Sequence, residues 1–432
     1  MSKFQMILTG IFIILAVGGV IIFSAYKGSS GDAVTVVIWG TIPEATFSEV
    51  VQATSLYQSK EFKIEYKQKN VTEFDTDFVE ALASGRGPDI FMLPSDKMLK
   101  HRNKIFPIPY NVFTQRQFKD YFIEGTEIYM APEGTLAFPI WTDPLVMYWN
   151  RTIFTEAKLT QPPKYWDEFH NLAKLITKKD GALNIQRSAV AFGEFSNISN
   201  AKAIILNLVM QAGNPVAVWN GLNVSSVFAD SSGGVVMPAE AAVNFYTEFG
   251  NPAKSSYSWN RSLSASRDYF LSGDLGIYFG FASEISNLQL KNPNLNFDVS
   301  EVPTERESKY YVSFANFQGL AITKATKVPA AAFSVISILS GKDGVKAFSE
   351  ALNLPPTRRD LLDFKPTDAY MSVFYDSAIR AKTWLDPEPT ESNTIFKNMI
   401  ESITSGRSRT GEAVLKAHRE LTNLLSKYAI SQ

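Results

Sequence analysis

The chain has 432 residues, which is long for one domain and sufficient for two. Its 42 Lys and Arg residues balance 43 Asp and Glu residues to a net charge of -1, which excludes the basic surface of a nucleic-acid-binding protein. Cysteine is absent, so disulfides, thiolate metal sites and a thiol nucleophile are excluded as well.

The first element is an apolar stretch without charged residues, 6–26. As a helix rising ~1.5 Å per residue, it is long enough to cross a bilayer core. A cleaved signal peptide would need small residues at the first and third positions before the cut, and Ala25 preceded by Phe23 fits this poorly. We therefore expect an uncleaved, single-pass membrane anchor and tether over 1–32. The length of the following chain favours export of the domain that it forms to the extracytoplasmic side.

Strands and helices alternate in the next part of the chain. Residues 34–39 form a nearly continuous apolar run, as in a buried parallel strand. A helix over 45–59, a strand over 62–66, a helix over 72–84 and a strand over 89–93 follow. This order predicts a mainly parallel sheet flanked by helices, whose ligands lie beyond the carboxyl ends of the strands. At those ends stand Trp39, Thr41, Glu44, Pro94 and Ser95.

Two prolines interrupt the next apolar segment, 134–154. Pro139 and Pro144 remove backbone donors between the runs 136–138 and 145–149. We therefore expect the strand to break twice and the chain to change direction or sheet there. Trp141, Thr142 and Asp143 fill the break, and an aromatic face beside a hydroxyl and a carboxylate suits a sugar or a similar polyhydroxylated ligand.

The remaining elements place further polar and aromatic residues at strand ends and in loops. We expect helices over 165–177, 200–212, 238–249, 264–272, 329–340, 342–351 and 411–428, with strands over 190–195, 310–317 and 319–322. Residues at the ends or breaks of these elements, or in a proline-rich loop, are Glu194, Asn197, Phe279, Gly280, Phe281, Asn316, Trp384 and Asp386.

Two motifs resemble a known family. The apolar strand ending in Pro139 leads through a polar break into Tyr148-x-Asn150, a helix start and P-x-x-W-D-E-F over 163–169. This resembles the crossover segment of family 1 extracellular solute-binding proteins, the ligand-capturing subunits of bacterial ATP-binding-cassette importers. A-x-G-x-x-P-D-[IV] over 83–90 is also family-like, and we assign Asp89 a structural role. Trp166, in the first motif, is expected to stabilise the core of a lobe.

The resemblance implies an α/β fold of the two-lobe, type II periplasmic-binding-protein kind. Lobe one would comprise 33–140 with 304–360, and lobe two 141–303 with 361–432. Three chain crossings, near 138–142, 302–304 and 360–364, would act as a hinge that closes on the ligand. The partners implied are a mono- or oligosaccharide, or a related polar solute, and the permease subunits of an importer, with the membrane reached through the N-terminal helix.

Within such a cleft, flat rings would cover the apolar faces of a sugar while carboxylates accept its hydroxyl protons. Trp39, Trp141 and Trp384 are the expected rings, with Asp143, Glu194 and Asp386 as polar partners. The alternative for each Trp is that it holds its loop to a lobe.

Catalysis has little support. The three His residues stand alone among charged or helical neighbours, so we expect solvated side chains, and no hydrolase, zincin or phosphate-loop motif occurs. A glycosidase needs only two carboxylates about 5 to 9 Å apart, which Asp143, Glu194, Glu284, Asp386 or Glu388 could supply. Because a sugar-binding cleft needs the same groups, we expect no catalytic residue, no cofactor and no metal ion. A carbohydrate-active enzyme and a ligand-presenting sensor are the alternatives.

Overall fold

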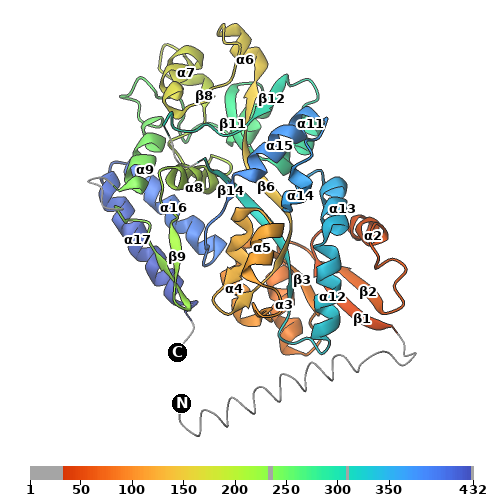
Figure 1. Cartoon of the computed structure of the whole chain (residues 1–432). Helices are drawn as coiled ribbons and strands as arrows, with labels where there is room; N and C mark the ends of the chain where they lie inside the picture. The colour runs from red at the N-terminus through yellow and green to blue at the C-terminus, as the bar shows by residue number, and fades with distance from the viewer. Residues whose placement is uncertain (1–32, 232–236, 308–310, 430–432) are drawn as a thin grey trace.

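The computed structural model describes residues 33–231, 237–307 and 311–429, which form two lobes of sheet and helices (Figure 1). The expected membrane anchor over 6–26 lies outside the described residues. Among the described residues, none of the helices combines the length and the apolar character needed to cross a bilayer.

One ten-stranded sheet runs through both lobes of the described chain, in the order β2-β1-β3-β13-β6-β11-β8-β7, with β12 also paired to β6 and β14 to β13. Its strands are β1 (Val34–Gly40), β2 (Phe62–Gln68), β3 (Ile90–Pro94), β6 (Phe138–Asn150), β7 (Lys178–Lys179), β8 (Ile185–Val190), β11 (Leu275–Phe281), β12 (Phe297–Ser300), β13 (Ser313–Ile322) and β14 (Ala381–Lys382). Two small hairpins are β4 (Met130–Ala131) with β5 (Gly134–Thr135), and β9 (Ala217–Asn220) with β10 (Asn223–Ser226).

The sheet is mixed, which corrects the expectation of mainly parallel pairing. β1 pairs in parallel with β2 and β3, and β11 with β8. The long strands β6 and β13 are antiparallel to each other, and they also pair antiparallel with β11 and β3 respectively. The reason is topological: both strands carry the chain between the lobes, and they do so in opposite directions.

The expectation that prolines break the segment 134–154 into separate strands is wrong. β6 is one strand of 13 residues. Pro139 pairs with Gly319 beside a register shift in β13, so a bulge lies where the proline lacks its donor. The β13 ladder reaches Pro144, and the β11 ladder begins at Leu145. The strand therefore continues, and its neighbours change at the second proline.

The first lobe is built on β1, β2 and β3. Around them lie α2 (Glu44–Gln52), α3 (Phe74–Ala83), η1 (Ser95–Lys97), α4 (Met98–His101), η2 (Arg102–Lys104), α5 (Gln115–Tyr121), η3 (Glu124–Tyr129), α12 (Pro329–Leu339), α13 (Lys342–Leu352) and α14 (Arg359–Leu362). Helix α2 ends at Gln52, seven residues before its expected end. It buries Phe47 against Phe348 of α13, with ring centroids 6.2 Å apart.

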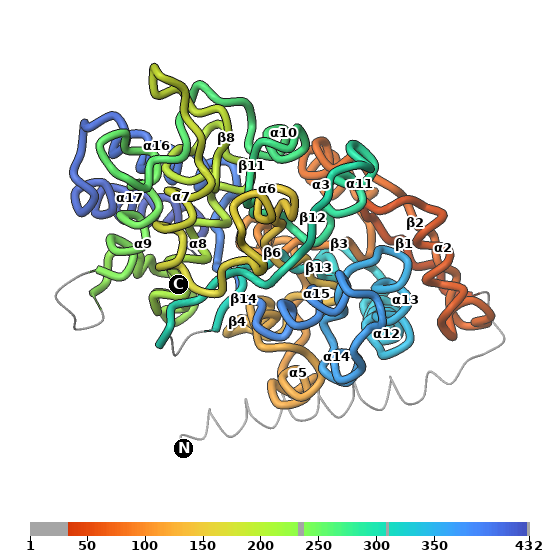
Figure 2. Tube along the Cα trace, turned by 90° about the horizontal axis from the view of Figure 1, so that it is seen from above, coloured from red at the N-terminus to blue at the C-terminus, as the bar shows by residue number. Residues whose placement is uncertain are grey.

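The second lobe is built on β8, β11 and β12. Its helices are α6 (Arg151–Glu156), η4 (Trp166–Glu168), α7 (Phe169–Ile176), α8 (Ala201–Gln211), α9 (Pro238–Glu248), α10 (Ser266–Leu271), η5 (Ala282–Glu284), α11 (Ile285–Lys291), α15 (Ala369–Ile379), α16 (Pro389–Thr404) and α17 (Thr410–Ser426). Figure 2 shows α16 and α17 beside α8 and α9, on the opposite side of the molecule from α12 and α13.

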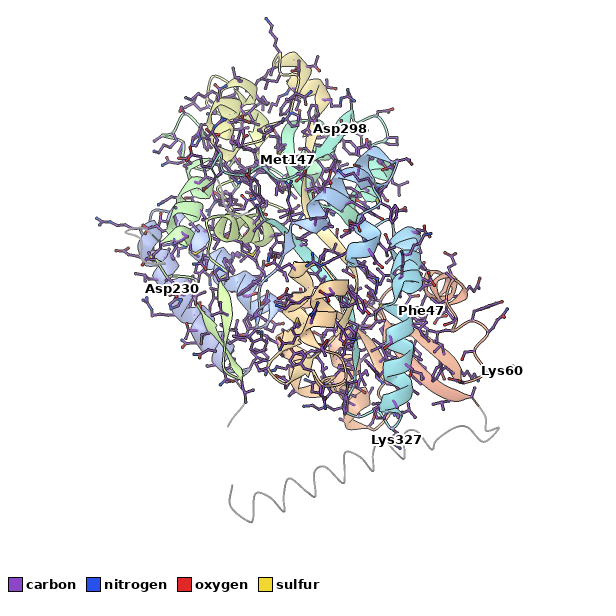
Figure 3. The ribbon with its side chains drawn as sticks, in the orientation of Figure 1. Phe47, Lys60, Met147, Asp230, Asp298 and Lys327 are labelled. Carbon is purple, nitrogen blue, oxygen red and sulfur yellow. The ribbon has the colours of Figure 1, made fainter. Side chains whose placement is uncertain are left out.

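Aromatic rings fill the core of the second lobe around Trp166. Its ring centroid lies 5.3 Å from that of Phe169 and 5.6 Å from that of Phe279, and its indole N–H donates to Gln211 Oε1 at 2.6 Å. The core role expected for Trp166 is confirmed. In Figure 3, Met147 of β6 lies in this lobe and Phe47 in the other.

Candidate functional site

The long strands β6 and β13 and the carboxyl end of β3 come together between the lobes, and we call this surface the floor. Ser95 Oγ accepts a hydrogen bond from the backbone N–H of Phe317 at 3.1 Å, and Thr142 Oγ1 donates to the backbone oxygen of Asn316 at 3.2 Å. Ser95 and Thr142 are buried, whereas Asn316 is half-buried opposite Asp143. The hydroxyl groups of Ser95 and Thr142 therefore hold this floor together.

Asp143 projects from the middle of β6 toward η5. Its carboxylate accepts the backbone N–H of Ser283 at 2.9 Å and the Ser283 hydroxyl at 2.6 Å. Partial burial raises the pKa of Asp143 to about 6, against the hydrogen bonds from Ser283. A carboxylate has about four acceptor sites, so this one can still accept from a ligand hydroxyl.

Glu284, directly after Ser283, is the centre of a polar network. It accepts from Asn200 Nδ2 at 2.7 Å, from the Tyr278 hydroxyl at 2.6 Å and from the backbone N–H of Phe281 at 2.9 Å. A Cβ on Gly280 would lie 3.1 Å from the Glu284 carboxylate and 2.6 Å from the Tyr278 ring. Glycine is therefore needed at 280 for packing.

The other two residues predicted at this strand end differ in exposure. Phe279 is buried in the aromatic core around Trp166, and its ring stacks 5.4 Å from that of Phe192. Phe281 is half-buried, with its ring 6.3 Å from that of Phe314 in β13. Of the two, Phe281 has the more accessible ring.

Glu194 and Asn197 are both engaged by the loop that follows α9. The Arg261 guanidinium donates to both carboxylate oxygens of Glu194, at 3.3 and 3.1 Å. Asn197 accepts the indole N–H of Trp259 at 3.2 Å and donates to the backbone oxygens of Asn260 and Leu263. These contacts give both side chains a structural role within the second lobe.

Trp384 and Asp386 lie in the second lobe, close to α8. Trp384 is 2% exposed, and its ring lies edge-on to Phe396 at 6.0 Å. Asp386 is buried, and its carboxylate accepts from Lys202 Nζ at 2.6 Å and from the Ser392 hydroxyl at 3.0 Å. Burial raises the pKa of Asp386, and the adjacent ammonium group opposes this.

The remaining predicted residues stand at the carboxyl ends of the first-lobe strands or in the middle of β6. Trp39 is 5% exposed and lies under Lys69, whose Nζ is 4.0 Å from the ring centroid. Trp141 is half-buried, 5.5 Å from the Phe348 ring. Thr41 and Pro94 are half-buried, and Glu44 is exposed in the first turn of α2. Of the three predicted rings, Trp141 is thus the most accessible.

A cavity of about 480 Å³ opens where the loop after β8 meets α16, within the range typical of ligand pockets. Its lining is Phe195, Ser196, Ile198, Asn200, Ala201, Lys202, Asn393 and Lys397. Asp96 of the first lobe is electrostatically coupled to this region: burial and the charge of Asp386 raise the pKa of Asp96 to about 6, and the charge of Lys202 opposes this rise.

None of the cavity residues was among the predicted site residues. Asn200 and Lys202 follow the predicted Glu194 and Asn197, so the same signal, a polar loop leading into a helix, could have found them. Asn393 and Lys397 lie almost two hundred residues further on, one turn apart on an amphipathic helix. No local pattern separates them from an ordinary solvated helix face.

The next features are the histidines and the possible metal ligands among the residues that the structure describes. The expectation of solvated histidines is wrong for His101, which is 1% exposed and lies 3.1 Å from Asp75; burial lowers its pKa despite that carboxylate. Within 33–231, 237–307 and 311–429, no cluster of three or more His, Asp or Glu side chains could hold a metal ion.

Comparisons with known proteins relate the chain to binding proteins. Residues 53–373 match the model of a family described as bacterial extracellular solute-binding protein. Comparison with curated proteins found no match.

Solved structures share the fold. A cyclo/maltodextrin-binding protein complexed with maltotetraose has a TM-score of 0.74 at 15% identity, covering 92% of this chain and 98% of that one. A cyclic alpha-maltosyl-1,6-maltose binding protein from Arthrobacter globiformis scores 0.75 at 14% identity, covering 91% and 100%. A sugar-binding protein from Xanthomonas citri scores 0.72 at 17% identity, covering 91% and 98%.

Proposed function

Because this chain belongs to the bacterial extracellular solute-binding protein family, we propose that it captures a carbohydrate or a related polar solute for an ATP-binding-cassette importer. The observation that carries the proposal is the agreement of the two-lobe fold, over about nine tenths of the chain, with proteins named for binding maltodextrins and related sugars. The family is one of binding proteins, and the chain is accordingly a binding protein and not an enzyme.

Solute capture would take place between lobes comprising 33–140 with 304–360 and 141–303 with 361–432. The support is the pair of long strands, β6 and β13, together with the hydrogen bond from the Thr142 backbone N–H to the Pro355 oxygen at 3.0 Å. Such short connections leave the lobes free to rotate, and a ligand that binds both lobes favours the closed arrangement.

Ligand contacts are assigned first to residues that remain accessible beside the floor. Trp141 offers a ring and Asp143 a carboxylate with spare acceptor sites, Asn316 is paired with Asp143, and the other candidates that remain accessible are Thr41, Glu44, Pro94 and Phe281. The cavity residues Ser196, Asn200, Asn393 and Lys397 extend this surface into the second lobe.

Attachment to the membrane through residues 6–26 and delivery to permease subunits complete the proposal. The uncharged apolar stretch supports the anchor. Mass spectrometry of the protein from its native membrane tests it, and a mature amino terminus near Ala25 or Tyr26 would contradict it.

Binding is tested by thermal unfolding of the full-length protein against a panel of mono- and oligosaccharides. A ligand at 100 times its Kd should stabilise the folded protein by about 2.7 kcal/mol. Small-angle scattering with the best ligand should then show a smaller radius of gyration. If no sugar of the panel stabilises the protein, carbohydrate capture is contradicted. If cleaved sugar is released, the protein has the activity of a carbohydrate-active enzyme.

A further inference from the structure

The carboxylates predicted to accept hydroxyl protons from a sugar are mostly occupied by other groups of the protein. Asp386 accepts from Lys202 and Ser392, and Glu194 is held at both oxygens by Arg261. Of Asp143, Glu194 and Asp386, it is Asp143, bound to Ser283, that keeps an accessible side. The region therefore offers a ligand fewer acceptors than its acidic residues suggest.

The cavity lining, in contrast, is rich in donors. It contains two lysines, two asparagines and a serine, and no carboxylate. Asn200 Nδ2 is directed to Glu284, whereas the side chain of Asn393 has no hydrogen-bond partner in the described chain. A ligand that fills this cavity must supply acceptors, because a desolvated donor without a partner costs free energy.

The two lysines differ in how far their charges are balanced. Lys202 is fixed by Asp386 at 2.6 Å and by Ser392 at 2.7 Å. Lys397 is half-buried, and its ammonium group has no ion pair or hydrogen bond with any residue in the described ranges. An ammonium group that lines a cavity without a counterion favours an anion there.

The nearest acidic neighbour on the same helix does not pair with Lys397. Glu401, one turn further along α16, accepts the hydroxyl of Ser196 at 2.7 Å, and its charge also acts on Arg261. The positive end of α8, which begins at Ala201 in the cavity wall, adds to the positive potential but does not by itself define a site.

We infer that the solute carries a carboxylate, as in a uronic acid or a uronate-containing oligosaccharide, and that Lys397 with Asn393 binds it. This inference rests on the proposed function and names its substrate class. Lys397 supplies a charge-assisted hydrogen bond, and Asn393, one turn earlier on the same face of α16, supplies a neutral donor beside it.

The test compares matched acidic and neutral sugars on the full-length protein by calorimetric titration. Glucuronic and galacturonic acids and their short oligomers are set against glucose, galactose and the corresponding neutral oligomers. We expect acidic sugars to bind about tenfold or more tightly than their neutral counterparts, and this advantage to shrink as salt rises.

Variants assign the effect to the cavity. Lys397→Gln should reduce affinity for the acidic sugar about tenfold and that for the neutral sugar much less, whereas Lys397→Arg should retain most of the preference. Lys416→Gln, on the exposed face of α17, is the matched control, and melting temperatures show that each variant folds.

Two results would overturn the inference in different ways. If acidic and neutral sugars bind with equal affinity and Lys397→Gln changes neither, the substrate needs no carboxylate. The proposal of carbohydrate capture would be unaffected. Binding of neither class would contradict the proposed function itself, and the inference with it.

Discussion

Lys100 Nζ lies 3.1 Å from Glu388 Oε1, and this ion pair joins the first lobe to the second. Lys100 also contacts Asp75, at 2.9 Å. Burial alone would lower the pKa of Lys100, but these two carboxylates hold it above its usual value. The pair is therefore charged at neutral pH.

The position of this ion pair relates it to the cavity. Glu388 Oε2 accepts the backbone N–H of Glu391 at 2.8 Å and so caps α16, whose later turns line the cavity. Two residues earlier, Asp386 holds the cavity residue Lys202. Under the proposed hinge, opening of the lobes would separate Lys100 from Glu388.

Loss of this pair should weaken solute binding without removing a ligand contact. We expect Lys100→Gln to lower affinity about fivefold, since a partly exposed ion pair contributes ~1 kcal/mol to the closed arrangement. Titration with the best sugar measures it. Glu388→Gln keeps an oxygen for the helix cap, so a double-mutant cycle isolates the pair. Lys97→Gln, which removes an ion pair with Asp75 inside the first lobe, is the control. Strictly additive effects in the cycle would show that the pair does not contribute to closure.

The tryptophans should separate into stabilising and binding residues. Trp384→Ala should destabilise the fold by about 3 to 5 kcal/mol, because it empties a buried site beside Phe396. Trp141→Ala should cost about 1 to 3 kcal/mol of solute affinity and less stability, because its ring is accessible at the floor. Urea unfolding and sugar titration of both variants check this. If both variants lose stability and neither loses solute affinity, the two rings stabilise the fold and do not bind the solute.

Removal of one buried hydrogen bond should show how the core of the second lobe is held. Trp166→Phe keeps one aromatic ring in place of the larger indole and leaves Gln211 Oε1 without its donor, and this hydrogen bond accounts for about 1 to 3 kcal/mol in addition to the cost of the lost volume. Trp219→Phe is the control, since its half-buried indole N–H has no partner in the described chain. Urea unfolding gives both values, and an equal small loss in the two variants would argue against the hydrogen bond.

Asp143 should make stability depend on pH in the acid range. Its pKa is about 6 in the folded protein, above the value of about 3.9 for an unfolded Asp. The folded state therefore binds this proton more tightly, and protonation between about pH 6 and pH 4 stabilises it. The stability of the wild type minus that of Asp143→Asn should rise as pH falls through this window.

Urea unfolding at intervals of pH measures this difference. Asp343→Asn, which removes an exposed carboxylate on α13, is the matched control. A difference that stays constant, or falls, between pH 6 and pH 4 would mean that Asp143 ionises in the folded protein as easily as in the unfolded chain.

The sequence alone was sufficient to predict a strand or the role of a residue where that feature depends on one segment of the chain. The apolar run over 34–39 predicts β1 because a strand covered on both faces reads as such a run, and β1 is buried at Val36 and from Ile38 onward, although it is exposed at Val34 and Thr35. The motif around Trp166 likewise identified a ring that ends in the core, and Asp89 was assigned a structural role that its hydrogen bond to the Val37 backbone N–H bears out.

Only the tertiary structure decided the continuity of β6 and the state of the acidic residues. A proline lacks a donor in any strand, but it ends a ladder only where the partner strand needs that donor, and this depends on the bulge in β13 and the start of β11. Likewise, whether Glu194 or Asp386 can accept from a ligand depends on Arg261 and Lys202, which are remote in sequence. The cavity joins 195–202 to 393–397 for the same reason: contacts across the fold place side chains together that the linear chain keeps almost two hundred residues apart.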